Sequence, residues 1–308
     1  YTYYHSVTGN QIAAPRLCQS TGYIFLTINS GSVKNQGMEL MITGTPVDTK
    51  DFTWDLVLNM SGNRGTLGDF VEGVDYFYVT DAQIGGVKAA SIPNGGYFLG
   101  MTGNYWLRET EKVQDVDKKT GELKVDKDGN PVMVDKEIEG GRYQIDAATG
   151  LYKLQGNTTN VVGNREPKLI GGLTSNFRWK DLSFSFLFDF RFGGDIYNGT
   201  QYYLTSLGQS MRTLENNRTS VTVEGVDSKT MEPVSITYKA GESYNVNGSV
   251  RSGEYMIQSY WSNYCSNAYN FIQSVNWLRL RNINLSYDFS NLIKGQDVLK
   301  GLVATFTA

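Results

Sequence analysis

The chain has 308 residues, and its net charge of −3, with no basic cluster, argues against a nucleic-acid partner. One histidine, His5, and two cysteines, Cys18 and Cys265, are too few for a zinc centre or a Cys/His catalytic set, so we expect no metal and no cofactor. Aromatic residues make up 13% of the chain and charged residues only 19%, and 34 glycines stand against 6 prolines, which is typical of an all-β protein with many turns.

The first strong strand pattern covers about 32–47 and 51–64, two segments joined by a short turn at 48–50. Side chains alternate there with the period of two that a strand with two different faces requires. Large apolar residues occupy one face of the second segment: Phe52, Trp54, Leu56, Leu58 and Met60. In the first segment Glu39 falls on the other face of the strand from Met38, Leu40 and Ile42. We therefore expect its carboxylate on the polar face, within reach of Arg178, Arg191 or another residue of that face.

The second strand pair spans about 169–179 and 182–193 around the two-residue turn Lys180-Asp181. One face of its second strand is almost entirely aromatic: Leu182, Phe184, Phe186, Phe188, Phe190 and Phe192. A last strand runs through 282–289, and Leu278 and Leu280 just before it stand out of phase with its alternation. Either a β-bulge or a strand end outside the membrane explains that slip.

Connections of two lengths join these strands. The turns at 48–50 and 180–181 are short, whereas about 65–168 and 194–275 are very long. No stretch approaches the ~18 to 20 apolar residues of a transmembrane helix, but short turns on one side and long loops on the other are expected of a membrane β-barrel. Phe52, Trp54, Trp179 and Tyr287 lie at strand ends on one side, as in an interfacial aromatic girdle. A soluble β-sandwich also alternates and remains the alternative.

The long connections contain two Asp-rich segments, at 115–121 and 126–130, that resemble the start of a calcium loop. The full ligand spacing is absent and no glutamate closes either segment, so we interpret both as hairpin turns. The sequence does not decide whether Cys18 and Cys265 pair.

Three ordered motifs carry a resemblance to a known family. The first is Asn35-Gln-Gly37-Met-Glu39, followed by Phe52-Thr-Trp54 and a strand that ends at Asn59. The second runs from 162 to 198 and the third from 277 to 287, with the sequence Leu-Arg-Leu-Arg-Asn near its start. Together they resemble the SusC-like (RagA-like) TonB-dependent transporters. The motif residues to which we assign structural roles are Asn35, Gly37, Glu39, Pro167, Gly171, Gly172, Gly193, Gly194, Asp195, Tyr197 and Asn198.

The resemblance implies that 1–308 are part of one antiparallel transmembrane β-barrel of 22 strands, with long extracellular loops at about 65–168 and 194–275. It covers the C-terminal part of the barrel, so we expect the chain to be truncated at both ends, with the plug upstream and the final strand downstream. At 143–150 the sequence departs from a stretch that in many relatives suits calcium, which argues against a metal there.

The resemblance also implies a function. The chain is expected in the outer membrane of a Gram-negative bacterium, in contact with outer-membrane lipid, where it takes part in the active import of an oligosaccharide or a peptide. Its implied partners are a SusD-like surface lipoprotein that acts as a lid and, through the missing plug segment, the TonB complex. The alternative is a soluble or surface-attached glycan-binding β-sandwich protein, and an ordinary siderophore receptor is the nearest alternative within transport.

Loop aromatics with neutral polar neighbours are the candidate substrate-binding residues: Tyr97, Tyr105, Trp106, Tyr202, Tyr203, Tyr260 and Trp261. The competing interpretation, which we favour, is that these rings pack the loops or touch the lid. No nucleophile elbow or phosphate-binding glycine loop is present, so we expect no catalytic residues and no enzyme activity.

Overall fold

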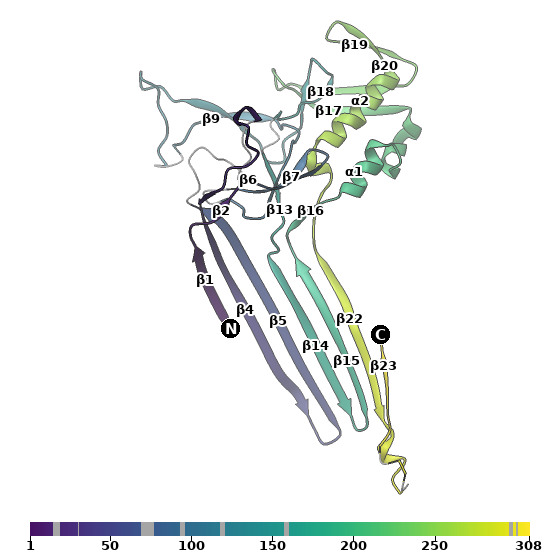
Figure 1. Ribbon diagram of the computed structural model, residues 1–308. Helices are drawn as coiled ribbons and strands as arrows, with labels where there is room; N and C mark the ends of the chain where they lie inside the picture. The colour runs from purple at the N-terminus through teal and green to yellow at the C-terminus, as the bar shows by residue number, and fades with distance from the viewer. Residues whose placement is uncertain are drawn as a thin grey trace.

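Seven antiparallel strands form the main sheet, in the order β1-β4-β5-β14-β15-β22-β23 (Figure 1). They are β1 (Thr2–Thr8), β4 (Ser32–Asp48), β5 (Phe52–Gly68), β14 (Leu169–Trp179), β15 (Leu182–Phe192), β22 (Trp277–Asp288) and β23 (Val303–Thr307). The computed structural model describes residues 1–14, 19–29, 31–68, 77–92, 96–117, 121–156, 160–295, 298–299 and 301–308. No helix in these ranges is both long and apolar enough to cross a membrane.

The predicted strands and short turns are confirmed. Strands β14 and β15 pair directly across Lys180-Asp181, where Lys180 adopts a φ of +53° as the tight turn requires. Between β4 and β5, the Thr49 hydroxyl accepts a hydrogen bond from the Phe52 amide. Strand β5 continues to Gly68, beyond the predicted end near 64, and so extends into the segment that we expected to be loop.

The two faces of the sheet differ sharply in polarity. A row of partners across five strands, Ile42–Leu58–Leu173–Phe188–Leu280, lies on one face. The adjacent row on the other face includes Asn59, Gly172, Asp189 and Arg279. The apolar row is open to its surroundings, since Ile42 is 48% and Leu280 45% exposed. A continuous apolar surface of this kind is what the lipid-facing side of a barrel needs.

A β-bulge restores the phase of strand β22, as one of the two sequence interpretations held. Leu187 of β15 is opposite Asn282, and the next residue, Phe188, is opposite Leu280, which leaves Arg281 as the extra residue. The bulge places Leu280 on the apolar face with the phenylalanines of β15, and it places Arg279 on the polar face.

Aromatic rings collect at the turn end of the strands, where the girdle was predicted. Phe177 stacks between Phe52, with ring centroids 6.3 Å apart, and Trp54, 5.7 Å apart. The Trp54 indole N–H donates to the Ser175 hydroxyl over 2.7 Å, so neither polar group is left unpaired on the apolar face. Trp179 and Tyr287 lie at or next to the ends of their strands.

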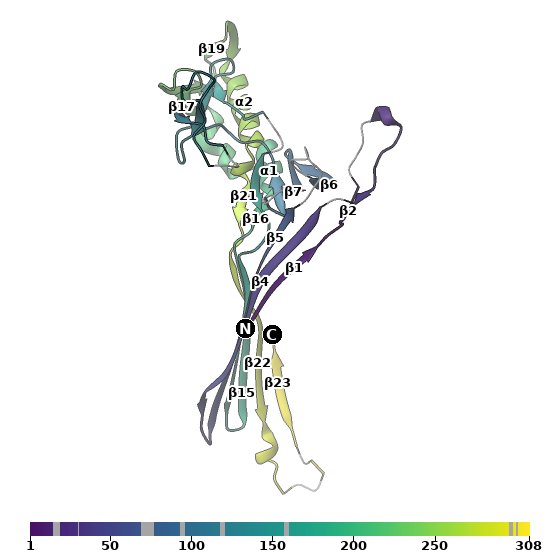
Figure 2. The same cartoon turned by 90° about the vertical axis from the view of Figure 1, so that its left-hand side faces the viewer.

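The two long connections fold together at the other end of the sheet, above the strands in Figures 1 and 2. We call this part the loop assembly. The first connection contains β6 (Phe77–Ile84), β7 (Val87–Ser91), β8 (Gly100–Thr102), β9 (Thr110–Gln114), β10 (Met133–Glu137), β11 (Gln144–Asp146), β12 (Leu151–Tyr152) and β13 (Val161–Asn164). The second contains β16 (Asp195–Tyr197), α1 (Gly199–Ser206), η2 (Met211–Arg218), β17 (Ser220–Asp227), β18 (Pro233–Lys239), β19 (Ser243–Val246), β20 (Ser249–Ser252), α2 (Gly253–Ser266), η3 (Ala268–Asn270) and β21 (Ile272–Ser274). The remaining short elements are β2 (Ile12–Ala13), η1 (Gln19–Thr21), β3 (Ile28–Asn29) and η4 (Phe289–Asn291).

The second connection contains two α-helices that the strand patterns of the sequence do not predict. Helix α2 begins where the Ser252 hydroxyl accepts from the Tyr255 amide, and Glu254 lies in its first turn. Helix α1 begins where the Asn198 side chain accepts from the Gln201 amide. The Asp-rich segment at 126–130 is a hairpin turn as predicted, and Asp126 accepts from the amides of Asp128 and Asn130. Residues 118–120 of the other Asp-rich segment lie outside the described residues.

Two neighbouring glycines of β14 allow a matched test of strand packing. A Cβ at Gly171 would collide with the Asn59 carbonyl oxygen and would lie 2.5 Å from the Phe190 ring, whereas a Cβ at Gly172 would meet nothing closer than 3.4 Å. We expect Gly171→Ala to destabilise the barrel by roughly 1–3 kcal/mol through overpacking, and Gly172→Ala to change its stability by much less. The measurement is the temperature at which the full-length protein loses its compact migration in detergent gels. Equal midpoints for both variants would contradict this packing.

Candidate functional site

The two long connections share a sheet and a hydrophobic core. Strand β11 of the first pairs in parallel with β17 of the second, with Gln144 opposite Val226 and Ile145 opposite Asp227. Their common core consists of Ile145, Leu151, Val221, Val223, Tyr238, Met256 and Ile257. Helix α2 supplies two of these residues, so packing on one side of the helix fixes which residues its other side presents.

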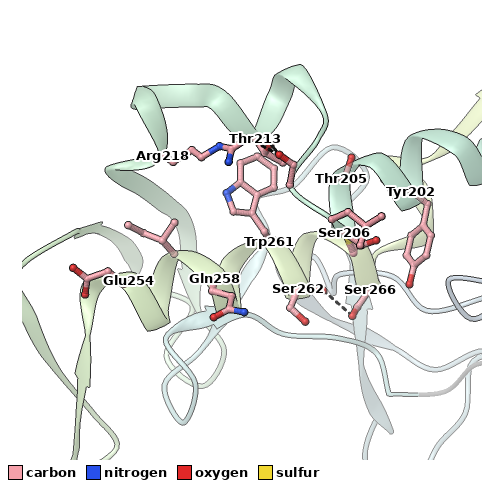
Figure 3. A pocket seen from close by; sticks show the side chains of 14 residues that line it. Tyr202, Thr205, Ser206, Thr213, Arg218, Glu254, Gln258, Trp261, Ser262 and Ser266 are labelled. Atoms are coloured by element: carbon pink, nitrogen blue, oxygen red, sulfur yellow. Dashed lines mark hydrogen bonds between the residues drawn. The ribbon is translucent and has the colours of Figure 1, made fainter.

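A groove of about 570 Å³ lies between α2 and the segment formed by α1 and η2 (Figure 3). Helix α2 contributes residues spaced three or four apart, which share one face of a helix. These residues are Glu254, Gln258, Trp261, Ser262 and Cys265. The Trp261 ring rises from the helix toward Thr213 and Arg218, and Tyr202 stands at the other end of the groove (Figure 3).

The chemistry of the groove is mostly neutral. The hydroxyls of Thr205, Ser206, Thr213, Ser262 and Ser266 line it together with the Gln258 amide. Among the described residues, the side chains of Gln258 and Ser262 make no hydrogen bond, so their polar groups are available to a ligand. A half-buried indole beside neutral donors and acceptors suits a ligand with apolar faces and many hydroxyl or amide groups.

Both charged groups of the groove are held in place by backbone atoms. The Arg218 guanidinium donates to the Gly208 carbonyl oxygen. The Glu254 carboxylate accepts from the Gly241 amide over 2.7 Å, and backbone amides, its own first, hold the pKa of this carboxyl below its usual value. Glu254 stands at one end of the helix face, whereas Arg218 lies on the side toward which the Trp261 ring rises (Figure 3).

The structure separates the predicted aromatic residues. Tyr202 and Trp261 line the groove, and Tyr260 turns toward the core of the loop assembly, where burial raises its pKa. Tyr97 and Tyr203 are exposed, at 42% and 53%, and neither lines the groove.

Trp106 is a core residue, as the packing interpretation held. It is 5% exposed and lies against Tyr143, Tyr152 and Tyr264, with ring centroids 5.1, 4.2 and 5.8 Å away. Its indole N–H finds no acceptor in the described part of the chain. Trp106 and Tyr105 line a second hollow of about 490 Å³, together with Arg108, Glu137, Tyr143, Asn160, Val161 and Tyr269.

Several motif residues connect the barrel strands to the loop assembly. Gly193 and Gly194 have φ of +78° and +80°, which favours glycine, and the Asp195 carboxylate accepts from the Asn164 amide over 2.9 Å. Pro167 directly follows Glu166, a residue to which the sequence motifs assigned no role. The Glu166 carboxylate is buried and accepts from the Asn63 side chain and the Gly65 amide.

The motif residues of β4 have separate positions. Gly37 leaves room for the Tyr4 ring of β1, which a Cβ would strike, and Asn35 is opposite Gly65 of β5. Glu39 lies on the polar face as predicted, but within the described residues it forms no ion pair with Arg178 or Arg191. Arg178 instead donates to the Thr53 hydroxyl and Arg191 to the Arg165 carbonyl.

No group of three or more metal-ligating side chains occurs among the described residues. Cys265 is a free thiol, 6% exposed, at the wall of the groove, while Cys18 lies outside the described residues. Burial raises the pKa of the Cys265 thiol to about 11. The thiol therefore favours the folded state fully below its unfolded pKa of about 8.5, and this contribution is lost as the pH rises toward 11.

The buried thiol predicts slow alkylation. In a Cys18→Ser variant of the folded protein, we expect Cys265 to react with iodoacetamide at pH 8.5 at least about tenfold more slowly than in urea, because the thiolate is the nucleophile. The measurement is the labelled fraction over time by mass spectrometry. Equal rates in the folded and unfolded protein would contradict this burial.

Trp106 and Tyr203 provide a matched pair of aromatic positions. Trp106→Ala removes a buried indole and is expected to destabilise the loop assembly by about 3–5 kcal/mol, whereas Tyr203→Ala removes an exposed ring and is expected to change little. Hydrogen exchange at the amides of β11 and α2 measures the difference. Unchanged exchange in Trp106→Ala would refute the core position of this residue.

Comparison with known proteins places this geometry in context. No family model matches the chain. Over 300 residues it is 26% identical to TonB-dependent receptor P39 of Formosa agariphila, covering 88% of this chain and 25% of that protein. Over 271 residues it is 27% identical to TonB-dependent receptor SusC of Bacteroides thetaiotaomicron, covering 88% of this chain and 22% of that protein.

Solved structures show the same fold. The RagAB peptide importer in its closed-closed state matches with a TM-score of 0.55 and 19% identity, over 99% of this chain and 28% of that chain. The open-open state of the same importer gives a TM-score of 0.55 and 17% identity. The chain thus spans about a quarter of the length of the proteins that it matches. The resemblance seen in the three motifs and the antiparallel barrel fold are confirmed.

Proposed function

We propose that this chain, similar to SusC-like TonB-dependent receptors and folded as part of their barrel, takes part in active nutrient import across the outer membrane of a Gram-negative bacterium. The observation that carries the proposal is the seven-stranded sheet with one exposed apolar face and one polar face. Lipid accommodates the first face, and a lumen accommodates the second. The loop assembly at one end of the strands then lies outside the cell, where a nutrient first arrives.

The groove along α2 is our candidate for substrate capture. Trp261 offers a flat apolar surface, and Gln258 and Ser262 offer unoccupied polar groups beside it. These groups fit an oligosaccharide or a peptide, both of which combine apolar faces with neutral hydrogen-bonding groups. RagAB, whose fold is similar, is a peptide importer, so both substrate classes belong to the proposal.

The proposed partners are a SusD-like surface lipoprotein and the TonB complex. Next to the groove, the segment formed by α1 and η2 carries a series of exposed apolar side chains: Tyr203, Leu204, Leu207, Met211 and Leu214. Such a surface suits contact with a lid. Energy would reach the barrel from TonB through a plug, which is expected in a segment beyond this chain.

The alternative of a glycan-binding sandwich is weaker on one specific observation. A sandwich packs the apolar faces of two sheets together at about 10 Å. In the described structure every small sheet except β2-β3 belongs to the loop assembly, and none of the small sheets covers the apolar face of the main sheet. We propose no enzyme activity, since the relatives are named as receptors and importers.

Substitution of Trp261 tests the capture role. In the full-length transporter we expect Trp261→Ala to weaken uptake of its substrate by about two- to thirteenfold at low concentration, the effect of losing one aromatic contact of roughly 0.5–1.5 kcal/mol. Tyr97→Ala, which removes an exposed ring outside both the groove and the proposed lid-contact surface, is the control. Unchanged uptake in Trp261→Ala, with normal amounts of protein in the membrane, would refute this role.

The native complex tests the proposed partner. Outer membranes extracted in mild detergent should yield this chain within a larger polypeptide bound to a lipoprotein, and mass spectrometry measures both masses. Recovery as a freely soluble protein of 34.3 kDa without a lipoprotein would contradict both the barrel and the partner.

A further inference from the structure

A second cluster of functional groups lies far from the groove, on the polar face of the main sheet. It occupies a hollow of about 880 Å³ that extends from the start of β1 and from β4, where Glu39 lines it, over β5, β14 and β15 to β22. Two arginines of β22 share one carboxylate there. Arg279 Nη2 lies 3.1 Å and Arg281 Nη1 lies 2.7 Å from Asp189 Oδ2.

The β-bulge brings both arginines to this face. Asn282 is opposite Leu187 on the polar face, so regular alternation from Asn282 would put Arg281 and Arg279 on the apolar face. Arg281 is instead the extra residue of the bulge, which shifts the alternation by one. Arg279 is therefore opposite Asp189 on the polar face, and Arg281 reaches the same carboxylate. A bulge that re-aims a side chain in this way is a specific feature of the strand rather than a defect.

The cluster keeps an excess of positive charge and of hydrogen-bond donors. Each guanidinium has five N–H donors, and among the described residues Asp189 is the hydrogen-bond partner of both. The two arginine side chains are 59% and 60% exposed, whereas Asp189 is 20% exposed. Arg279 is also oriented by the Trp277 ring, 4.9 Å away. One carboxylate therefore fixes two guanidinium groups whose remaining donors face the hollow.

Neighbouring groups leave room for an anion. Gly172 is opposite Asp189 and has no side chain. Glu39 lies on β4, three strands from β15, so the usual strand spacing separates it from β15 by about 14 Å. Its carboxylate is thus too distant to neutralise Arg279 and Arg281. Arg191, also in the hollow, donates to backbone carbonyl oxygens, so its positive charge is not cancelled by a carboxylate.

From this geometry we propose that Arg279 and Arg281, held by Asp189, form a binding site for the carboxylate of a solute inside the barrel. Guanidinium groups match a carboxylate in both charge and hydrogen-bond geometry. The ligand class is a small oligomer that bears a carboxylate, either a uronic-acid sugar or an acidic peptide. This inference rests on the proposed transport function, because solutes must enter the lumen.

The test measures calorimetric binding to the full-length protein in detergent. The probes are trigalacturonate with its fully methyl-esterified form, and triglutamate with triglutamine, so that each acid has a neutral partner of similar size. All variants carry Trp261→Ala, which weakens binding in the groove equally in each of them. Differences between variants therefore report the arginine site, and a failure of the capture proposal leaves this measurement intact. The parent is expected to bind at least one acid about tenfold more tightly than its neutral partner, and the pair that shows this preference identifies the sugar or the peptide source.

The variants separate binding from structural support. Arg279→Gln with Arg281→Gln is expected to reduce the preference to about one, while Arg279→Lys with Arg281→Lys retains part of it because the charge remains. Arg178→Gln, on the same face about 20 Å along the strands, is the control and should keep the preference.

Two outcomes would overturn the proposal. One is a parent protein that binds the acidic and neutral probes equally. The other is a glutamine double variant that keeps the preference of the parent. If that double variant lowers the unfolding temperature without any change in preference, the arginines serve another segment of the protein, and the solute site is refuted.

Discussion

One constraint governs the main sheet: a backbone that crosses hydrocarbon must satisfy its hydrogen bonds within the protein. Antiparallel pairing of seven neighbouring strands meets this constraint and leaves each side chain on one of two faces. The row from Ile42 to Leu280 can then be wholly apolar while the adjacent row holds Asp189 and Arg279. Strand pairing thus determines which of the two faces each side chain of the sheet lies on. Even the polar groups on the apolar face, Trp54 and Ser175, pair with each other.

The transition from strand to loop assembly is the second determinant of the structure. Glycines with positive φ at 193 and 194, the Asp195 contact with Asn164 and the buried Glu166 direct the chain away from the ladder. Beyond that point, the pairing of β11 with β17 makes a single body of two connections that are far apart in sequence. The position of α2 on the core follows from that pairing, and so does the face of α2 that forms the groove.

Much of the sheet is predictable from the sequence because a period of two is a local signal. The six apolar positions between Leu182 and Phe192 indicate their strand without any knowledge of its neighbours. The phase error at Leu278 and Leu280 indicates an irregularity, and the structure decides for the bulge over a strand end outside the membrane. Helix α2 was missed because its many aromatic residues favour strands, and its capping residue, Ser252, is a weak signal alone. Trp106 and Trp261 look alike in sequence, yet one is in the core and the other lines the groove, because burial depends on contacts between distant segments. The shared contact of Arg279 and Arg281 with Asp189 likewise requires the register of two strands.

The orientation of the two faces is the central claim, and spin labels measure it directly. Single labels at Phe184, Phe186 and Leu285 on the apolar face, and at Ser185 and Asn284 on the polar face, would be placed in the full-length protein in lipid vesicles. We predict that collisions with lipid-soluble oxygen are high at the first set and low at the second, alternating with a period of two along β15. Labels on the apolar face that are shielded from oxygen would mean that another layer of protein covers this face, and the barrel account would be wrong.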